Sequence, residues 1–198
     1  MMTNQEKQIK FMQYFKQGDS VLELGCGWGH FLGLCQQFGI MATGVDISVE
    51  AVEKCKQSGF KAVNAEAIAY LMKCKLTFNG VICRHLVEHF LNNEAAEMLF
   101  QSHRVLKPGG IFILVTPNVR NTNVMMENFW NDPDHIRPYP IKTLAEHLQR
   151  IGFEIIYSGE DPDSWAHDPL RVLVRKFRSL LTGLPQEAPD AILIARKR

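Results

Sequence analysis

Apolar and polar positions along the chain follow two alternating patterns. Short apolar runs, each ended by glycine or a polar residue, predict strands, and they cover residues 20–24, 41–46, 61–63, 78–83, 111–116, 153–157 and 191–195. Between these runs, apolar residues recur every three or four positions and predict helices, which cover residues 29–38, 49–59, 67–73, 93–105 and 140–151. Strands that alternate with helices at this spacing predict an α/β fold with a mostly parallel sheet.

Polar residues stand at the point where several of the predicted strands end. Ligands of doubly wound sheets bind beyond the carboxyl ends of the strands. The sequence therefore predicts that these residues converge at one edge of the sheet. They are Glu23, Gly25, Asp46, Asn64, Arg84, His85 and the pair Pro117-Asn118.

The first segment outside this alternation is residues 1–18. It contains a predicted amphipathic helix over residues 5–16, because Ile9, Met12 and Phe15 recur at near-helical spacing. We expect this helix to pack on the domain that follows.

Three further segments interrupt the pattern. Residues 106–110 combine proline with two glycines and predict a turn before the fifth strand. Residues 117–140 are predicted to form an irregular substrate loop, whose aromatic residues favour an ordered lid. Residues 160–188 form an insertion between the sixth and seventh strands. We expect one domain over residues 1–198.

Composition narrows the functional classes. The formal net charge is +1, so the sequence does not indicate a nucleic acid partner. The five cysteines include no CxxC pair, which favours reduced thiols in a cytoplasmic protein over disulfides or a metal site. No run approaches the roughly 18–20 apolar residues that span a bilayer. We therefore expect a cytoplasmic protein without a bound metal ion.

A glycine-rich turn follows the first predicted strand, and two nucleotide-binding patterns compete for it. A dinucleotide fingerprint requires G-x-G-x-x-G, but counting from Gly25 places His30 where the third glycine should stand. Glu23 is a carboxylate in a buried strand, where its charge is costly unless a partner such as a cationic ligand pairs with it. The pattern is better described as E-x-G-x-G-x-G, with Asp46 after the next strand.

This pattern resembles motif I of the class I S-adenosylmethionine-dependent methyltransferases. The resemblance covers residues 18–160 and rests on five segments: 21–29, 44–48, 64–66, 83–89 and 106–110. Asn64 departs from the more common aspartate of the third segment. The resemblance implies a Rossmann-like class I methyltransferase fold. Its seven-stranded sheet is mostly parallel with an antiparallel last strand, and helices cover both faces.

The resemblance also implies S-adenosyl-L-methionine as the cofactor. Glu23 would accept from its amino group and Asp46 from its ribose hydroxyls, because an ionised carboxylate is an acceptor only. The implied cofactor-binding residues are Glu23, Gly25, Cys26, Gly27, Asp46, Ile47, Asn64, Ala65, Glu66 and Arg84. As simpler alternatives, Glu23 caps a helix or pairs with Arg84, and Asp46 only caps the following helix.

Two histidines are candidate catalytic groups at the acceptor. His85 follows the fourth strand, and His135 lies in residues 129–140. This block is similar to one in methyltransferases encoded with bacterial glycan biosynthesis genes. The substrate residues implied by that similarity are His135, Arg137 and Tyr139. As alternatives, His135 and Arg137 serve a rigid proline-bracketed loop, while His85, Glu88 and His89 fix the local chain.

Residues 169–182 in the insertion have the pattern of a basic amphipathic helix. An apolar stripe and an arginine face alternate along it. Such a helix lies on an anionic membrane surface, or serves as a lid or dimer helix with a solvated basic face. The sequence does not determine the oligomeric state.

Together these features predict an S-adenosylmethionine-dependent methyltransferase. The expected acceptor is an oxygen of a small molecule or a glycan. The alternatives are methylation of a quinone or other lipid-like phenol, and a non-catalytic module that only binds the cofactor.

Overall fold

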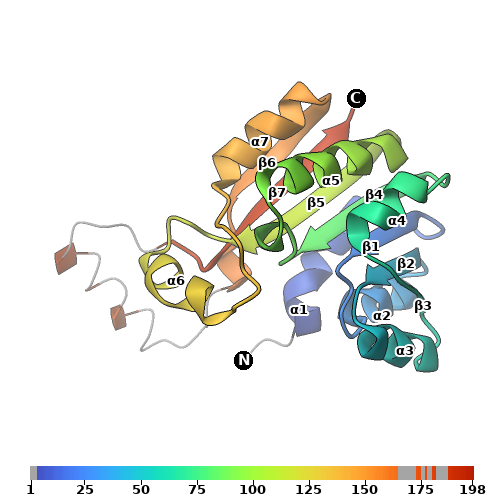
Figure 1. The fold of residues 1–198 in the computed structure, drawn as a ribbon, viewed down its shortest axis with the longest axis horizontal. Helices are drawn as coiled ribbons and strands as arrows, with labels where there is room; N and C mark the ends of the chain where they lie inside the picture. The colour runs from blue at the N-terminus through green and yellow to red at the C-terminus, as the bar shows by residue number, and fades with distance from the viewer. Residues whose placement is uncertain (1–3, 165–172, 175–176, 178–179, 182–186) are drawn as a thin grey trace.

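The computed structural model describes residues 4–164, 173–174, 177, 180–181 and 187–198. Its centre is a sheet of seven strands in the order β3-β2-β1-β4-β5-β7-β6 (Figure 1). The strands are β1 (Ser20–Leu24), β2 (Met41–Asp46), β3 (Lys61–Asn64), β4 (Phe78–Arg84), β5 (Leu106–Pro117), β6 (Phe153–Glu160) and β7 (Asp190–Lys197). All the predicted strands are confirmed, with bounds that differ by a few residues.

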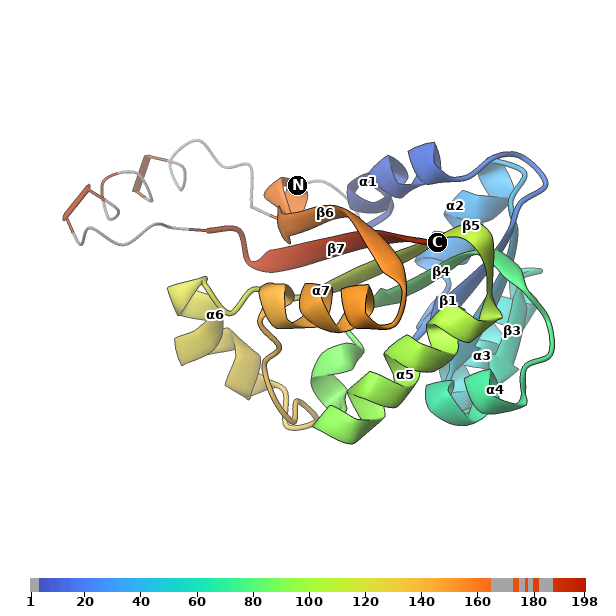
Figure 2. The same ribbon diagram turned by 90° about the horizontal axis from the view of Figure 1, so that it is seen from above.

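Helices cover both faces of the sheet, as predicted. The α-helices are α1 (Asn4–Gln8), α2 (His30–Gln37), α3 (Val49–Gln57), α4 (Ala67–Lys73), α5 (Asn92–Val105), α6 (Thr122–Met126) and α7 (Ile141–Arg150). Short 3-10 helices are η1 (Ile9–Tyr14), η2 (Val87–His89), η3 (Asn128–Asn131) and η4 (Pro162–Ser164). The view from above places α4, α5 and α7 on one side of the sheet and α1 and α2 on the other (Figure 2).

The two layers of core follow from the alternation of side chains along each strand. In β5, Phe112 and Leu114 pack into the cluster under α4, α5 and α7. Ile113 and Val115 point the other way and join the cluster that contains Phe11 and Phe31. Consecutive apolar residues in this strand are therefore needed, because both faces are buried.

The direction of β7 is the exception in the sheet. β1 pairs in parallel with β2 and β4, and β5 with β4, whereas β7 is antiparallel to both β5 and β6. The antiparallel last strand implied by the resemblance is confirmed. Since β7 runs backwards, Asp190 at its start lies at the same edge as the carboxyl ends of the parallel strands, paired with Pro117.

The N-terminal segment differs from the predicted helix. It forms a short α-helix that continues as the 3-10 helix η1, and the tighter winding changes which residues face the sheet. Ile9, predicted to pack, is 52% exposed, while Phe11, Met12 and Phe15 are buried.

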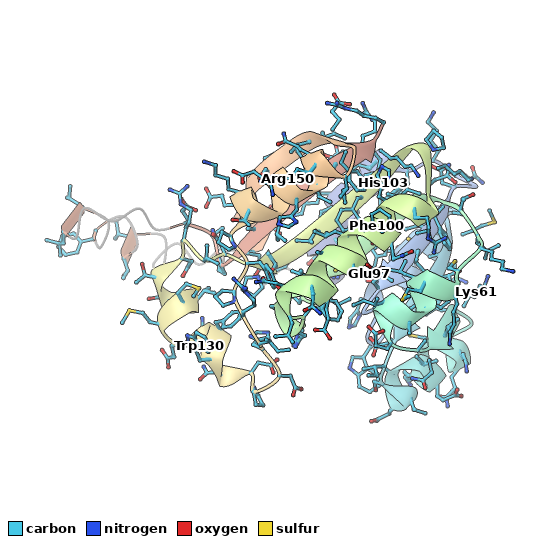
Figure 3. The ribbon with its side chains drawn as sticks, turned by 45° about the horizontal axis from the view of Figure 1, so that its top comes forward. Lys61, Glu97, Phe100, His103, Trp130 and Arg150 are labelled. Atoms are coloured by element: carbon cyan, nitrogen blue, oxygen red, sulfur yellow. The ribbon has the colours of Figure 1, made fainter. Side chains whose placement is uncertain are left out.

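Two predicted irregular segments also have more regular structure than expected. Residues 106–110, predicted as a turn, belong to β5, where the pairing with β4 is shifted between Phe78 and Gly80. Residues 117–140 contain α6 and η3. In Figure 3, Trp130 lies on this segment, to the side of the labelled α5 residues Glu97, Phe100 and His103.

The basic amphipathic helix predicted for residues 169–182 falls largely outside the described residues. Those that are described there, Leu173, Val174, Phe177, Leu180 and Leu181, have exposed side chains. Among the described residues, no helix has the length and apolar character that a bilayer crossing requires. All five cysteines are buried free thiols.

We predict that Gly80→Ala destabilises the protein by about 1–3 kcal/mol, the usual cost of overpacking a core. A Cβ at this position would lie 2.2 Å from Cε1 of Phe15, the residue that directly follows η1. Urea unfolding of the variant, alone and combined with Phe15→Leu, measures the effect. The shorter side chain should reduce the penalty of the alanine. An equal penalty in both backgrounds would contradict this packing.

Candidate functional site

Two cavities lie side by side at the carboxyl edge of the sheet. Their volumes are about 470 Å³ and about 380 Å³, and both are lined by Gly25, Gly27 and His85. The strand ends bring Glu23, Gly25, Asp46, Arg84 and His85 to these cavities, whereas the other predicted residues, Asn64, Pro117 and Asn118, line neither of them. We call the larger one the Asp46 cavity and the smaller one the Glu23 cavity, after the carboxylate that lines each.

The glycine turn between β1 and α2 is held by the end of β2. The Val45 carbonyl accepts from the backbone N–H groups of Gly25 at 2.9 Å and Cys26 at 3.1 Å. The Gly27 N–H donates to Oδ2 of Asp46 at 2.7 Å. Gly27 has a φ of +47°, and a Cβ there would meet no atom within 4 Å. A side chain at this position would thus occupy the space that the two cavities share.

Asp46 has two visible roles. Besides Gly27, its carboxylate accepts from the Ser48 N–H at 2.9 Å through Oδ1. Ser48, in turn, caps α3, because its Oγ accepts from the Ala51 N–H. Each carboxylate oxygen still has a lone pair available. Asp46 can therefore hold the turn and accept hydroxyl donors from the cavity at the same time. The exposed side chain of Ile47 provides an apolar wall beside it.

The residues after β3 use more of their hydrogen-bonding groups within the protein than the sequence indicates. The Ala65 N–H donates to the Asp46 carbonyl at 3.0 Å, and the Asn64 amide donates to the carbonyls of Asp46 and Ile47. Glu66 caps α4, because its carboxylate accepts from the Ile68 and Ala69 N–H groups. Ala65 and Glu66 line the Asp46 cavity, but Asn64 does not. The main visible role of this segment is therefore to hold the backbone around Ile47 in place.

The Glu23 cavity contains two buried oxygen atoms that lack a hydrogen bond among the described residues. They are Oε2 of Glu23 and Oε1 of Gln8, on side chains that are 3% and 1% exposed. Burial raises the pKa of Glu23 to about 8, the charge of Arg84 opposes this rise, and the charge of Asp46 adds to it. Buried acceptors without donors are costly, so this cavity is suited to a ligand that donates hydrogen bonds.

Charged groups surround these two acceptors. Lys7, Arg84 and Asp190 line the Glu23 cavity with them. Burial lowers the pKa of Arg84, and the charges of Glu23 and Asp190 oppose that shift. Burial raises the pKa of Asp190, and the charges of His85 and Arg84 oppose that rise. Both signs of charge are therefore present, as recognition of a zwitterionic amino acid group requires.

His85 stands where the two cavities meet. It has a φ of +48°, an uncommon conformation for a residue with a side chain. Its Nδ1 lies 3.4 Å from Oε1 of Glu88, and its Nε2 lies 3.7 Å from Oδ2 of Asp190. Burial alone would lower its pKa, but the interaction with Glu88 and the charge of Asp190 raise it above the usual value. His85 can therefore hold or accept a proton at the junction.

The three predicted substrate residues do not line either cavity. His135 was expected to face the methyl group, but its imidazole has other partners. Its Nδ1 hydrogen-bonds to the Phe129 carbonyl at 2.7 Å, and its ring packs between Phe129 and His89. The Arg137 guanidinium bonds to Asn92, and the Tyr139 hydroxyl donates to the Phe90 carbonyl at 2.8 Å. These bonds hold the loop against the start of α5.

Sequence reasoning missed Lys7, Gln8 and Asp190. Lys7 and Gln8 come from α1, and only tertiary packing brings that helix to the cavity. A signal for Asp190 did exist. Asp190 directly precedes the last apolar run, and an antiparallel strand starts at the edge where parallel strands end. A separate hollow of about 580 Å³ between α7 and β6 is lined by Asn118, which the sequence predicted to join the other site residues and which lines neither cavity.

The chemical groups that line the two cavities suit the parts of S-adenosylmethionine. Glu23 and Gln8 leave buried acceptors for an amino group, while Asp46 can accept ribose hydroxyls beside the apolar wall of Ile47. The glycine turn leaves the space between them open. Cys26 lines the Glu23 cavity with its neighbours, and burial raises the pKa of its thiol, so it contributes packing as a neutral group.

Comparisons with known proteins agree with this fit. A family profile described as a methyltransferase domain matches residues 4–158. The crystal structure of an S-adenosylmethionine-dependent methyltransferase from Archaeoglobus fulgidus superposes with a TM-score of 0.79 and 27% sequence identity, over 98% of this chain and 92% of that one.

Two curated relatives give shorter matches. A probable S-adenosylmethionine-dependent methyltransferase of Mycolicibacterium smegmatis is 29% identical over 140 residues, 70% of this chain and 53% of the relative. A ubiquinone biosynthesis O-methyltransferase of Pseudomonas aeruginosa is 33% identical over 109 residues, 51% of this chain and 45% of the relative. The chain thus spans about half the length of these relatives.

We predict that Glu23 makes the protein less stable as the pH rises from about 4.5 to about 8, the ordinary and the raised pKa of this carboxyl group. Over that range the unfolded carboxyl loses its proton while the folded one keeps it. Each pKa unit corresponds to about 1.4 kcal/mol, so the upper limit is several kcal/mol. Urea unfolding at each pH should show a smaller decrease for Glu23→Gln. Parallel curves for the two proteins would contradict the prediction.

Proposed function

This chain belongs to the family of S-adenosylmethionine-dependent methyltransferases, and we propose that it transfers a methyl group to an oxygen atom of a small molecule or a glycan. When bound, S-adenosylmethionine supplies an activated methyl group on a sulfonium centre. The residues of this chain bind the cofactor, orient it and accept the proton of the acceptor hydroxyl.

The observation that carries the proposal is the pair of carboxylates at the two ends of the glycine turn. We assign the buried Glu23, whose Oε2 has no hydrogen bond among the described residues, with Gln8 and Arg84, to the amino acid end of the cofactor. Asp46 is assigned to the ribose, and Ile47 to the adenine. Gly25, Cys26 and Gly27 let the chain lie close to the ligand. Asn64, Ala65 and Glu66 act mainly by holding the adenine side in shape through their hydrogen bonds.

An oxygen acceptor is supported by the position of His85. Methyl transfer to a hydroxyl benefits from a base near the reacting oxygen, and His85 lines both cavities. We propose that its imidazole takes the acceptor proton, with Glu88 and Asp190 stabilising the charged ring. Arg137 and Tyr139 are then positioning residues, because they fasten the loop that borders the acceptor side.

A phenol of a quinone precursor is the second candidate acceptor. It is favoured by the similarity to a ubiquinone biosynthesis O-methyltransferase, at 33% identity over 109 residues. Both candidates use a hydroxyl oxygen, so the site requires the same chemistry. Parallel assays with sugar and phenol acceptors, reading out S-adenosylhomocysteine, distinguish them. We further propose a cytoplasmic location. The exposed apolar side chains of Leu173, Val174, Phe177, Leu180 and Leu181 are a candidate membrane contact.

We predict that cofactor binding releases a proton from Glu23. Its pKa of about 8 means that the free protein is mostly protonated there at pH 7. The amino group of the cofactor favours the carboxylate form and lowers that pKa. Calorimetry of S-adenosylmethionine binding in buffers of different ionisation enthalpy should therefore show the release of up to one proton per site.

The matched variant is Glu23→Gln, which should bind more weakly and release fewer protons. Glu53→Gln, on an exposed surface pair with Lys56, is the control and should behave as wild type. If wild type and Glu23→Gln release the same number of protons, the assignment of Glu23 to the amino group is wrong.

We also predict that His85→Gln lowers kcat by about 10²–10⁴-fold, the usual contribution of a general base, while S-adenosylhomocysteine binds with little change. The base must be neutral, and its pKa is raised. The wild-type rate should therefore increase with pH through a midpoint above 6.5, the ordinary value for histidine. Initial rates from pH 5.5 to 9 provide the measurement. Wild-type turnover in His85→Gln would exclude the role.

A further inference from the structure

The loop of residues 132–139 meets η2 at a cluster of three metal-ligating side chains. One carboxylate oxygen of Glu88 and one ring nitrogen each of His89 and His135 lie within 4.8 Å of one another. We propose that these three residues form a binding site for a divalent transition-metal cation, of which Zn²⁺ is the first to test. A cation with bonds of about 2.1 Å holds its ligands roughly 3–3.5 Å apart, so small side-chain rotations would close the site.

Both histidines are held in the form that a metal requires. Nδ1 of His89 lies 3.0 Å from the Asp134 carbonyl, and Nδ1 of His135 lies 2.7 Å from the Phe129 carbonyl. A carbonyl can only accept, so each Nδ1 carries the proton and donates it. In the neutral ring, each Nε2 then has a free lone pair. Metal-ligating histidines usually donate their other N–H to a carbonyl or carboxylate in this way, which fixes the tautomer and the ring orientation.

Glu88 supplies the anionic ligand. Its side chain is fully buried, with 0% exposure. Its Oε2 accepts from the Thr116 hydroxyl at 3.1 Å, while Oε1 has no hydrogen bond among the described residues. A basic side chain also approaches this oxygen, since Nδ1 of His85 lies 3.4 Å from Oε1. Burying an incompletely paired carboxylate is costly, and a cation shared with His89 and His135 would satisfy it.

The backbone brings the two sides of the cluster together. The Ile136 and Arg137 N–H groups both donate to the Glu88 carbonyl, at 2.9 Å and 3.2 Å. His135 directly precedes this pair, so the same bonds that dock the loop carry its imidazole to Glu88 and His89. The ring centroids of His89 and His135 lie 4.8 Å apart. The site is therefore assembled by the main chain rather than by chance contacts of exposed side chains.

The donor set selects the class of metal. Two imidazoles and one carboxylate suit Zn²⁺ and similar transition metals, whereas Mg²⁺ and Ca²⁺ prefer sites made of oxygen atoms alone. Asp132 offers a further carboxylate on the exposed side, since its Oδ2 lies 3.7 Å from Nε2 of His135. Three protein ligands leave a position for water or for a substrate oxygen.

The place of the cluster suggests its use, and this step rests on the proposed function. His89 lines the Asp46 cavity together with His85. An acceptor hydroxyl bound to the cation would lose its proton more readily. The site would thus select acceptors that carry an oxygen able to bind a metal. It would also explain a histidine in the loop that does not itself face the cavity.

Metal content tests the site directly, without any methyl transfer. The purified full chain is stripped with a chelator, incubated with a small excess of Zn²⁺ and desalted, and its zinc is measured by mass spectrometry. We expect about one zinc per chain in wild type, and background in His89→Gln/His135→Gln. His147→Gln on α7 is the matched control and should retain the metal. Wild type with no more zinc than the double variant would overturn the proposal.

Two further measurements separate misfolding and failure of the enzyme from failure of the site. Zn²⁺ should raise the Tm of wild type and of His147→Gln but not that of the double variant. The far-ultraviolet circular dichroism of the double variant should match that of wild type and so report an intact fold. Retained zinc without methylation of any oxygen acceptor would refute the proposed function alone. Binding of S-adenosylhomocysteine without zinc in wild type would refute the metal site alone.

Discussion

The end of β2 holds the glycine turn, and the candidate site depends on this constraint. The Val45 carbonyl and the Asp46 carboxylate together accept from three consecutive backbone N–H groups, those of Gly25, Cys26 and Gly27. A hydrogen bond to a charged group contributes about 1.5–3 kcal/mol. The turn is therefore fixed before any ligand arrives, and the space beside it stays open because Gly27 has no side chain. The two cavities meet at this point.

Two buried carboxylates mark the functional edge of the sheet. Glu23 is the second-last residue of β1, and Glu88 follows β4 in η2. Each keeps one oxygen without a hydrogen bond among the described residues. Such groups reduce stability unless a donor or a cation pairs with them, and for this reason both proposals place a ligand at this edge. The proposed amino group at Glu23 and the proposed cation at Glu88 account for them in the same physical terms.

Several site residues have hydrogen-bond partners that differ from those expected from the sequence. Asn64, Ala65 and Glu66 have hydrogen bonds to the backbone or to a helix end, so they shape the cavity around Ile47. His135 lines neither cavity, and its Nδ1 hydrogen-bonds to the Phe129 carbonyl. A sequence pattern identifies the residue type at a position, but it does not indicate which neighbouring carbonyl will accept its proton.

The sequence by itself determined the strands, most helices, the glycine turn and the two acidic residues that flank it. These features depend on local periodicity and on residues within a few positions of one another, which the chain displays directly. Only the tertiary structure decided that α1 brings Gln8 to Glu23, that β7 brings Asp190 to the same edge, and that the 132–139 loop brings His135 to Glu88. Each of these contacts joins segments separated by between 15 and more than 100 positions in the printed sequence. Side-chain packing and backbone hydrogen bonds across the sheet edge select them. Of the three, Asp190 has a local signal, its place directly before the last apolar run, and this signal indicates the edge only when the strand is known to be antiparallel.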